Sequence, residues 1–276
     1  MTTRDYRTTS ADGTGLAVQE WGNPDGPELL LIHGIAQSRL CFSRQTDSEL
    51  AAGFRIVAFD LRGHGMSDKP ADPAAYTDGR RWADDVAAVI RGAGLRRPVL
   101  VGWSLGGRVV AQFLDCHGDR GIAGLHFVGS RTVIDPARPT LGPGAVHLAA
   151  MQSADLETNV EGTSAFLRAC VHHPLPPEEF SAMLAYNMLS PAMVRAATLQ
   201  WPGDFAAALA RVSVPTLVTH GLADRIILPA AAEITAGIVP AARLSWYPEI
   251  GHCPFREAPE RFNAELADFA RAAWAR

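Results

Sequence analysis

The stretch Gly102-Trp103-Ser104-Leu105-Gly106-Gly107 decides the fold, because it joins an apolar run to a helical pattern through a turn that places a serine between glycines. The preceding run, residues 98–101, predicts a buried strand, and residues 105–117 repeat apolar side chains along one helix face. A serine on a sharp strand-to-helix turn has a strained backbone, and a side chain at position 102 or 106 would collide with the neighbouring strand or helix. The turn exposes the serine hydroxyl beside a helix N-terminus, although the motif taken alone also fits a purely structural turn.

Other parts of the chain repeat this alternation of strand and helix. Residues 5–21 alternate loosely around Asp12-Gly13, which is typical of two antiparallel edge strands. Helical patterns at residues 78–92 and 259–274 separate short apolar runs of the kind found in parallel strands buried on both faces. These runs are residues 28–32, 55–59, 124–128, 214–219 and 243–247. We therefore expect an α/β fold with a mostly parallel, eight-stranded, doubly wound sheet flanked by helices.

Residues 131–211 interrupt the alternation. No strand run is evident there, and nine of the nineteen prolines fall between Pro136 and Pro215. Apolar helical pieces at 146–151, 164–171, 178–189 and 193–201 make a disordered linker a poor interpretation. We expect a core made of residues 1–130 and 212–276, with residues 131–211 forming a helical cap at one edge of the sheet.

Composition and charge exclude several classes of protein. Among 276 residues the net charge is −4, and 24 of the 25 basic residues are arginines without a basic run, so neither nucleic acid nor an anionic membrane is an expected partner. No signal-like N-terminus and no apolar run of about 18 residues is present, which favours a cytoplasmic location. A small-molecule substrate is the expected partner, and the sequence does not indicate an oligomeric state.

The sequence contains none of the familiar cofactor motifs. The four cysteines form no CxxC pair, and neither an HExxH motif nor a clustered His/Asp metal spacing occurs. No Gly-x-Gly-x-x-Gly follows the first parallel strand, so dinucleotide binding has no support. We expect no metal ion and no other cofactor.

A serine hydroxyl needs a base and an acid before it becomes a good nucleophile, and the order of residues along the chain selects both. On a strand-turn-helix scaffold of this kind the order is serine, acid, histidine. Asp224 lies in the loop after the strand at 214–219, and His252 is the single histidine that follows it. Parallel strands bring their carboxyl ends to one edge, so Ser104, Asp224 and His252 form the expected catalytic triad. His220 is expected to be a structural hydrogen-bonding residue beside the acid loop.

These residues resemble the α/β-hydrolase superfamily over essentially the whole chain. The resemblance rests on His33-Gly34, Asp60 to Ser67, Gly221-Leu-Ala-Asp224 and Gly251-His-Cys-Pro254, together with the serine turn. It implies that the backbone N–H groups of Ile35 and Leu105 form an oxyanion hole and that His33 braces that loop. The stretches 33–45, 60–67, 76–95 and 99–107 are most similar to the cofactor-free, non-haem haloperoxidases, which are serine esterases with perhydrolase side activity.

The expected activity is hydrolysis of a small, largely uncharged carboxylic ester or lactone through an acyl-enzyme. The expected pocket residues are His33, Trp103, Phe166, Tyr186 and Trp201, and Trp103 is bulkier than the Phe or His often found before the nucleophile in this superfamily. A serine at the turn argues against the dehalogenases and epoxide hydrolases of this fold, which place Asp there. Three alternatives stay open: a C–C bond hydrolase or an acyl-homoserine lactone hydrolase, which the tail 251–262 also resembles, and a slow-turnover ligand receptor.

Overall fold

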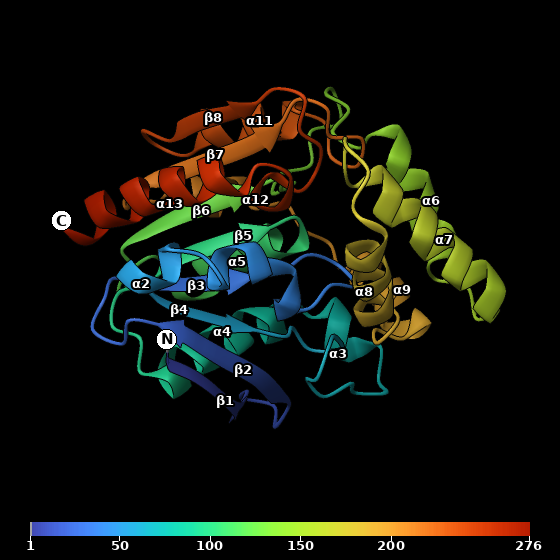
Figure 1. Ribbon diagram of the computed structural model, residues 1–276, viewed down its shortest axis with the longest axis horizontal. Helices are drawn as coiled ribbons and strands as arrows, with labels where there is room; N and C mark the ends of the chain where they lie inside the picture. Colours follow the sequence, from blue (N-terminus) through green and yellow to red (C-terminus); the bar gives the residue numbers. More distant parts are fainter. Residues whose placement is uncertain (1) are drawn as a thin grey trace.

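Six parallel strands lie side by side at the centre of the computed structural model, which describes residues 2–276 (Figure 1). An antiparallel pair at one edge completes an eight-stranded sheet in the order β1-β2-β4-β3-β5-β6-β7-β8. The strands are β1 (Thr2–Thr9), β2 (Gly15–Gly22), β3 (Glu28–Ile32), β4 (Arg55–Phe59), β5 (Val99–Trp103), β6 (Gly124–Val128), β7 (Thr216–Gly221) and β8 (Arg243–Tyr247). The mostly parallel α/β sheet expected from the sequence is confirmed.

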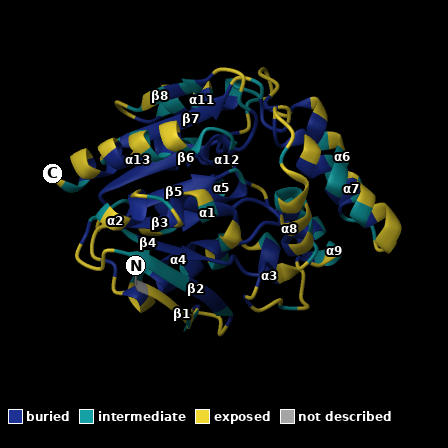
Figure 2. Ribbon diagram, in the orientation of Figure 1, coloured by how far each residue is buried: buried dark blue, intermediate teal, exposed yellow. Residues whose placement is uncertain are grey.

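The apolar composition of the central strands matches their position between two helical layers. Every residue of β3, β5, β6 and β7 is buried, and Figure 2 shows these central strands in the buried colour, whereas β1, β2 and β8 at the two edges are partly exposed. One layer contains α4 (Gly79–Ala93) packed on α5 (Leu105–His117), together with α10 (Ala206–Leu209) and α11 (Ala230–Ile238). On the other face α13 (Pro259–Trp274) crosses β5 and β6 and packs on α2 (Leu50–Gly53) (Figure 1).

Local sequence signals set the helix ends. The Asp78 side chain accepts a hydrogen bond of 2.9 Å from the N–H of Arg80 and so caps α4, which ends at Gly94 in the left-handed conformation (φ +64°). The helix α11 was not expected from the sequence, because its Ala-rich stretch carries a weak apolar stripe. Four short helical pieces precede α4: the 3-10 turn Arg39–Phe42, α1 (Ser43–Thr46), α2 and α3 (Ala74–Thr77).

The chain between β6 and β7 is helical and extends beyond one end of the sheet (Figure 1). After a 3-10 turn at Pro143–Val146 it forms α6 (His147–Ala150), α7 (Leu156–Ala169), α8 (Pro177–Asn187) and α9 (Ala192–Gln200). The helix α7 begins eight residues before the expected Ser164, because the Asp155 side chain caps it by accepting from the N–H of Thr158 at 2.9 Å. The first half of α7 is rich in polar side chains, so the apolar pattern of the sequence did not predict it.

A buried arginine holds these helices together. Arg195 on α9 is 1 % exposed and has no carboxylate partner within residues 2–276. It donates instead to five oxygens at 2.7–3.2 Å: the carbonyls of Met151, Asn187 and Ser190 and the side chains of Asn159 and Thr163. Burial lowers its pKa to about 10, so the guanidinium stays charged at neutral pH. Its charge is therefore compensated by the carbonyl ends of α6 and α8 and by two polar side chains of α7.

Replacing Arg195 by Met should destabilise the protein by at least about 2 kcal/mol, since several buried oxygens lose their donor at once. Chemical denaturation monitored by circular dichroism measures this loss. Arg168→Met is the matched control, because Arg168 is an exposed arginine on α7 whose guanidinium lies over the Phe180 ring. The control should change the unfolding free energy by less than about 1 kcal/mol. Equal effects of the two variants would contradict this interpretation.

Candidate active site

Ser104 lies on a strained turn between β5 and α5. Its backbone has φ 54° and ψ −115°, a left-handed conformation that is unfavourable for a residue with a side chain. The strain is held by close packing: a Cβ on Gly106 would lie 2.1 Å from the carbonyl oxygen of Ile32, and one on Gly102 would lie 2.7 Å from Gly107 Cα. The N–H of Ser104 also donates to the Val128 carbonyl at 2.9 Å. The need for glycine at 102 and 106, expected from the motif, is thus explained by backbone contacts on β3 and α5.

Asp224 and His252 lie in the loops after β7 and β8, and their side chains meet. His252 Nδ1 is 2.6 Å from Asp224 Oδ2, and both side chains are buried. The other carboxylate oxygen, Oδ1, accepts from the N–H groups of Ile226 at 2.8 Å and Ile227 at 3.0 Å. An ionised carboxylate only accepts, so Nδ1 carries the proton and Nε2 presents its lone pair. No residue within 2–276 forms a hydrogen bond with this buried Nε2, which leaves it available as a base.

Backbone contacts keep the imidazole of His252 in place. Its N–H donates to the Cys170 carbonyl at 2.8 Å, and its carbonyl accepts from Trp103 Nε1 at 2.8 Å. The Trp103 ring packs against the imidazole with 5.6 Å between ring centroids. Trp103, directly before Ser104, therefore ties the serine turn to the histidine loop.

His220, at the end of β7, contacts the loop that carries Asp224. Its Nε2 lies 2.9 Å from the Ile227 carbonyl and 3.4 Å from Asp224 Oδ2. Burial lowers the pKa of His220, so the contact with Asp224 is that of a neutral imidazole rather than an ion pair. A neutral Nε2–H donates to the nearer carbonyl, in agreement with the structural role expected for this residue.

The loop after β3 passes directly over the nucleophile turn. A Cβ on Gly34 would lie 3.2 Å from Ser104 Cβ, and Ala36 adopts a positive φ of 57°. His33 braces this loop: its Nε2 accepts from the Leu61 N–H at 3.0 Å, and its Nδ1 donates to the Gly34 carbonyl at 2.8 Å. Burial lowers the pKa of His33 to about 4, which keeps the ring neutral and both bonds intact.

The backbone N–H groups of Ile35 and Leu105 belong to this loop and to the first residue of α5. Neither N–H donates a hydrogen bond to an acceptor within residues 2–276. Two free donors in segments that line the same cavity as Ser104, one of them at a helix N-terminus, are groups of the kind that can stabilise a developing oxyanion.

A cavity of about 190 Å³ opens at Ser104. Its walls come from α5, α6, α7, α9 and the loop after β7, and they are mostly apolar with two arginines. The lining residues are Ile35, Ser104, Leu105, Arg108, Arg131, Leu141, Leu148, Phe166, Leu199, Ile226 and Ile227. Neither arginine was among the expected pocket residues, although Arg108 could have been predicted because a residue at i+4 shares the helix face of Ser104.

Of the five expected pocket residues, Phe166 lines this cavity and the other four do not. His33 is fully buried in the loop brace, and Trp103 packs edge-on against Phe255 at 4.9 Å beneath the turn. Trp201 stacks on Trp82, with ring centroids 5.6 Å apart. Pairing of aromatic rings in the core explains why these two tryptophans do not reach the substrate side.

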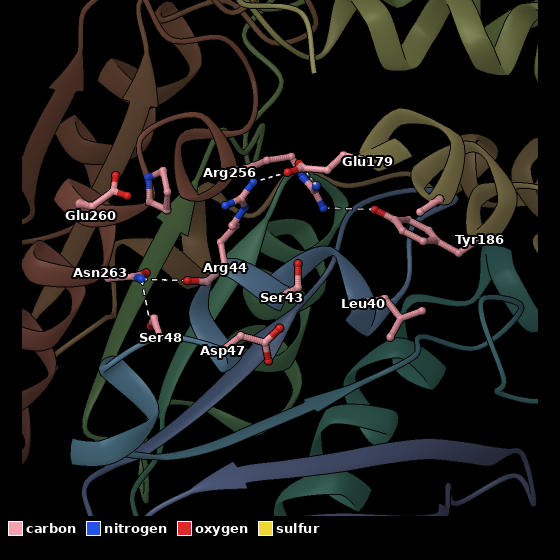
Figure 3. Close-up of a pocket in the computed structure, with 12 residues that line it drawn as sticks. Leu40, Ser43, Arg44, Asp47, Ser48, Glu179, Tyr186, Arg256, Glu260 and Asn263 are labelled. Atoms are coloured by element: carbon pink, nitrogen blue, oxygen red, sulfur yellow. Dashed lines mark hydrogen bonds and ion pairs between the residues drawn. The ribbon is translucent and has the colours of Figure 1, made fainter. Parts of the chain in front are cut away.

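Tyr186 lies at a different, larger cavity of about 630 Å³ between α8 and the segments around α1, α12 (Pro254–Glu257) and α13 (Figure 3). Its hydroxyl is 3.4 Å from Arg256 Nη2, and Arg256 in turn pairs with Glu179 at 3.2 Å. Neither Ser104, Asp224 nor His252 lines this space. Arg44 and Arg256 both pair with Glu179, and Asn263 donates to Ser48 Oγ (Figure 3).

Residues 2–276 contain no group of three or more His, Cys, Asp or Glu side chains arranged to hold a metal ion. In the same range, none of the helices combines the length and apolar character needed to cross a bilayer.

Comparison with known proteins identifies relatives along the whole chain. The profile of the alpha/beta hydrolase family matches residues 29–265. A non-heme haloperoxidase from Rhodococcus erythropolis is 29% identical, covering 95% of this chain and 97% of the relative, and a bifunctional esterase/perhydrolase from Acinetobacter calcoaceticus is 28% identical over 96% and 99%. The crystal structure of a suggested aryl esterase from Burkholderia cenocepacia superposes with a TM-score of 0.94 at 40% identity, covering 99% of this chain and 100% of that one.

The packing at the turn leads to a stability prediction. Gly106→Ala should destabilise the protein by about 3 kcal/mol and lower its activity, because the new Cβ meets the Ile32 carbonyl at 2.1 Å. Gly237→Ala is the matched control: it lies inside α11 with nothing within 4 Å of the new methyl group, so it should raise stability by up to about 1 kcal/mol. Urea unfolding of both variants measures the difference, and a neutral Gly106→Ala would rule out the steric explanation.

Proposed function

Because the chain belongs to the alpha/beta hydrolase family, we propose that it is a serine esterase that cleaves a small carboxylic ester through Ser104, His252 and Asp224. The observation that carries this proposal is the Asp224–His252 pair at 2.6 Å, with the unbonded Nε2 of His252 on the side of the ring away from the acid. A histidine held in this tautomer is a general base for a serine hydroxyl. The esterases among the relatives support the same reaction type.

In the proposed acylation step, Ser104 Oγ attacks the ester carbonyl while His252 Nε2 accepts the hydroxyl proton. His252 then returns that proton to the leaving alcohol, and Asp224 stabilises the imidazolium. The N–H groups of Ile35 and Leu105 would hold the oxyanion, each such donor being worth roughly 100- to 1,000-fold in rate. In deacylation water takes the place of the alcohol, with His252 again as base. Hydrogen peroxide in place of water would give a peracid, so a perhydrolase side reaction needs no additional group.

The cavity restricts the substrate in size. A volume of about 190 Å³ beside Ser104 suits a short acyl chain, with Leu148, Phe166 and Leu199 as its apolar wall. These three residues lie on α6, α7 and α9, which supports residues 131–211 as a cap that shapes the acyl site. A small lactone would react with the same serine, histidine and oxyanion donors. Multiple turnover of an ester would distinguish an enzyme from a ligand receptor.

Replacing Ser104 by Ala should lower the turnover of p-nitrophenyl acetate by roughly a millionfold relative to wild type, by analogy with serine-protease triads. Multiple-turnover release of p-nitrophenol measures the effect, and circular dichroism should show an unchanged fold. Full hydrolysis by Ser104→Ala would exclude this nucleophile. A wild type that releases a single equivalent and stops would favour the receptor.

Asp224→Asn should lower kcat by roughly ten-thousandfold, again by analogy with serine proteases. The amide can turn its NH₂ group toward Nδ1, and the imidazole then holds its proton on Nε2, where it cannot act as a base. Steady-state kinetics with the same ester measures the loss. Wild-type kcat in this variant would show that Asp224 does not set the tautomer.

A further inference from the structure

Two arginines share the cavity wall with the nucleophile. Arg108 lies on α5 four residues after Ser104, and Arg131 follows β6 at the start of the helical segment. Both side chains are partly buried, and every other cavity residue except Ser104 is apolar. Apolar walls with a few converging polar groups are typical of ligand sites, where the polar groups determine which ligand binds.

Neutral partners hold the two guanidinium groups in position. Arg108 Nη2 donates to the Trp201 carbonyl at 2.7 Å, and its Cζ lies 4.8 Å from the centroid of the Trp201 ring. Arg131 Nε donates to Thr140 Oγ1 at 2.7 Å. Within residues 2–276 neither arginine forms a salt bridge, and their remaining N–H groups donate to no protein acceptor. Each guanidinium is thus held in place by one hydrogen bond and keeps other N–H groups free to bind a ligand.

The electrostatic environment of these groups is unfavourable without a counter-ion. Burial and the positive charge of Arg131 lower the pKa of Arg108 to about 10, and burial also lowers the pKa of Arg131. Both stay protonated at neutral pH, so two like charges line one partly buried cavity. An anion between them would relieve the repulsion and use the free donors.

Three fully or almost fully buried arginines of this protein have larger sets of partners. Arg62 is fully buried and binds Asp85 through two bonds of 2.6 and 2.7 Å. Arg256 pairs with Glu179, and Arg195 has five oxygen acceptors. Arg108 and Arg131 have neither a carboxylate nor a full set of carbonyls.

We propose that Arg108 and Arg131 form a carboxylate-binding subsite, and that the substrates are esters carrying a free carboxylate, such as half-esters of short dicarboxylic acids. The inference rests on the proposed esterase function and replaces the largely uncharged substrate expected from the sequence. Four helical residues rise about 6 Å, and a helical side chain leans back toward the N-terminus, so the carboxylate lies only a few bonds from the carbonyl at Ser104. A carboxylate can accept from both guanidinium groups at once.

The test compares monomethyl succinate, glutarate and adipate with their dimethyl diesters, which differ only in the neutral second ester. In the wild type, kcat/KM for at least one half-ester should exceed that for its diester by roughly 10- to 100-fold, as expected for a charge-assisted hydrogen-bonded pair. Acetoxyacetate, whose carboxylate lies on the alcohol side, shows which half of the ester faces the arginines. A preference for it over its methyl ester supports the subsite and assigns it to the leaving group.

Substitution of each arginine tests whether the two side chains cause the preference for half-esters. Arg108→Met and Arg131→Met should each reduce the ratio of half-ester to diester kcat/KM at least fivefold, and Arg108→Lys should retain part of it. Because the ratio is taken within each variant, a general loss of folded enzyme cancels. Arg211→Met is the matched control, since Arg211 is an exposed arginine outside the cavity, and its ratio should equal that of the wild type. Free glutarate should inhibit diester hydrolysis competitively, with a Ki raised at least fivefold in Arg108→Met.

Two failures are distinguishable. A wild type that hydrolyses the diesters in a Ser104-dependent manner, but prefers no carboxylate-bearing ester, overturns the subsite and leaves the esterase proposal intact. Retained preference in both Arg→Met variants also overturns it. Hydrolysis that persists in Ser104→Ala overturns the proposed function instead.

Discussion

The close contact between the backbone of the serine turn and strand β3 is the constraint on which the site depends. Gly106 leaves no room for a methyl group beside the Ile32 carbonyl, and this contact holds Ser104 at φ 54°. The same proximity brings the loop after β3 over Ser104, and Ile35 of that loop lines the same cavity as Ser104 and Leu105. The Asp224–His252 pair stands on the other side of β5 and is tied to the turn through Trp103.

Burial controls the charges around this turn in two opposite ways. The imidazoles of His33 and His220 are kept neutral by desolvation, and each then serves as a fixed donor that orients a loop. Arginine cannot lose its proton at neutral pH, so a buried guanidinium needs acceptors. The protein supplies these acceptors for Arg62 and Arg195. In the cavity beside Ser104 a ligand would supply the acceptors that Arg108 and Arg131 lack.

Most of the fold was predictable because buried parallel strands and amphipathic helices leave strong local patterns. The six central strands and the helices α4, α5 and α13 lie within a few residues of the predicted ranges. The helix α11 and the first half of α7 were missed, since an alanine-rich helix and a helix with a buried polar face have no clear apolar stripe. Of the candidate site, chain order singled out Asp224 and His252, whose side chains meet in the structure. Four of the five expected pocket residues lie outside the cavity at Ser104, because large aromatic side chains pack with each other as readily as they line a cavity.

The sequence by itself determined the sheet, the serine turn and the order of the acid and the histidine, because glycine spacing, apolar periodicity and strand ends are local properties. Only the tertiary structure decided which side chains surround the nucleophile. That depends on the arrangement of α6, α7 and α9 against α5, and on where each arginine finds its acceptors. A sequence of 25 basic and 29 acidic residues does not show which arginine lacks an acidic partner, since ion pairs depend on the distance between segments far apart in the chain.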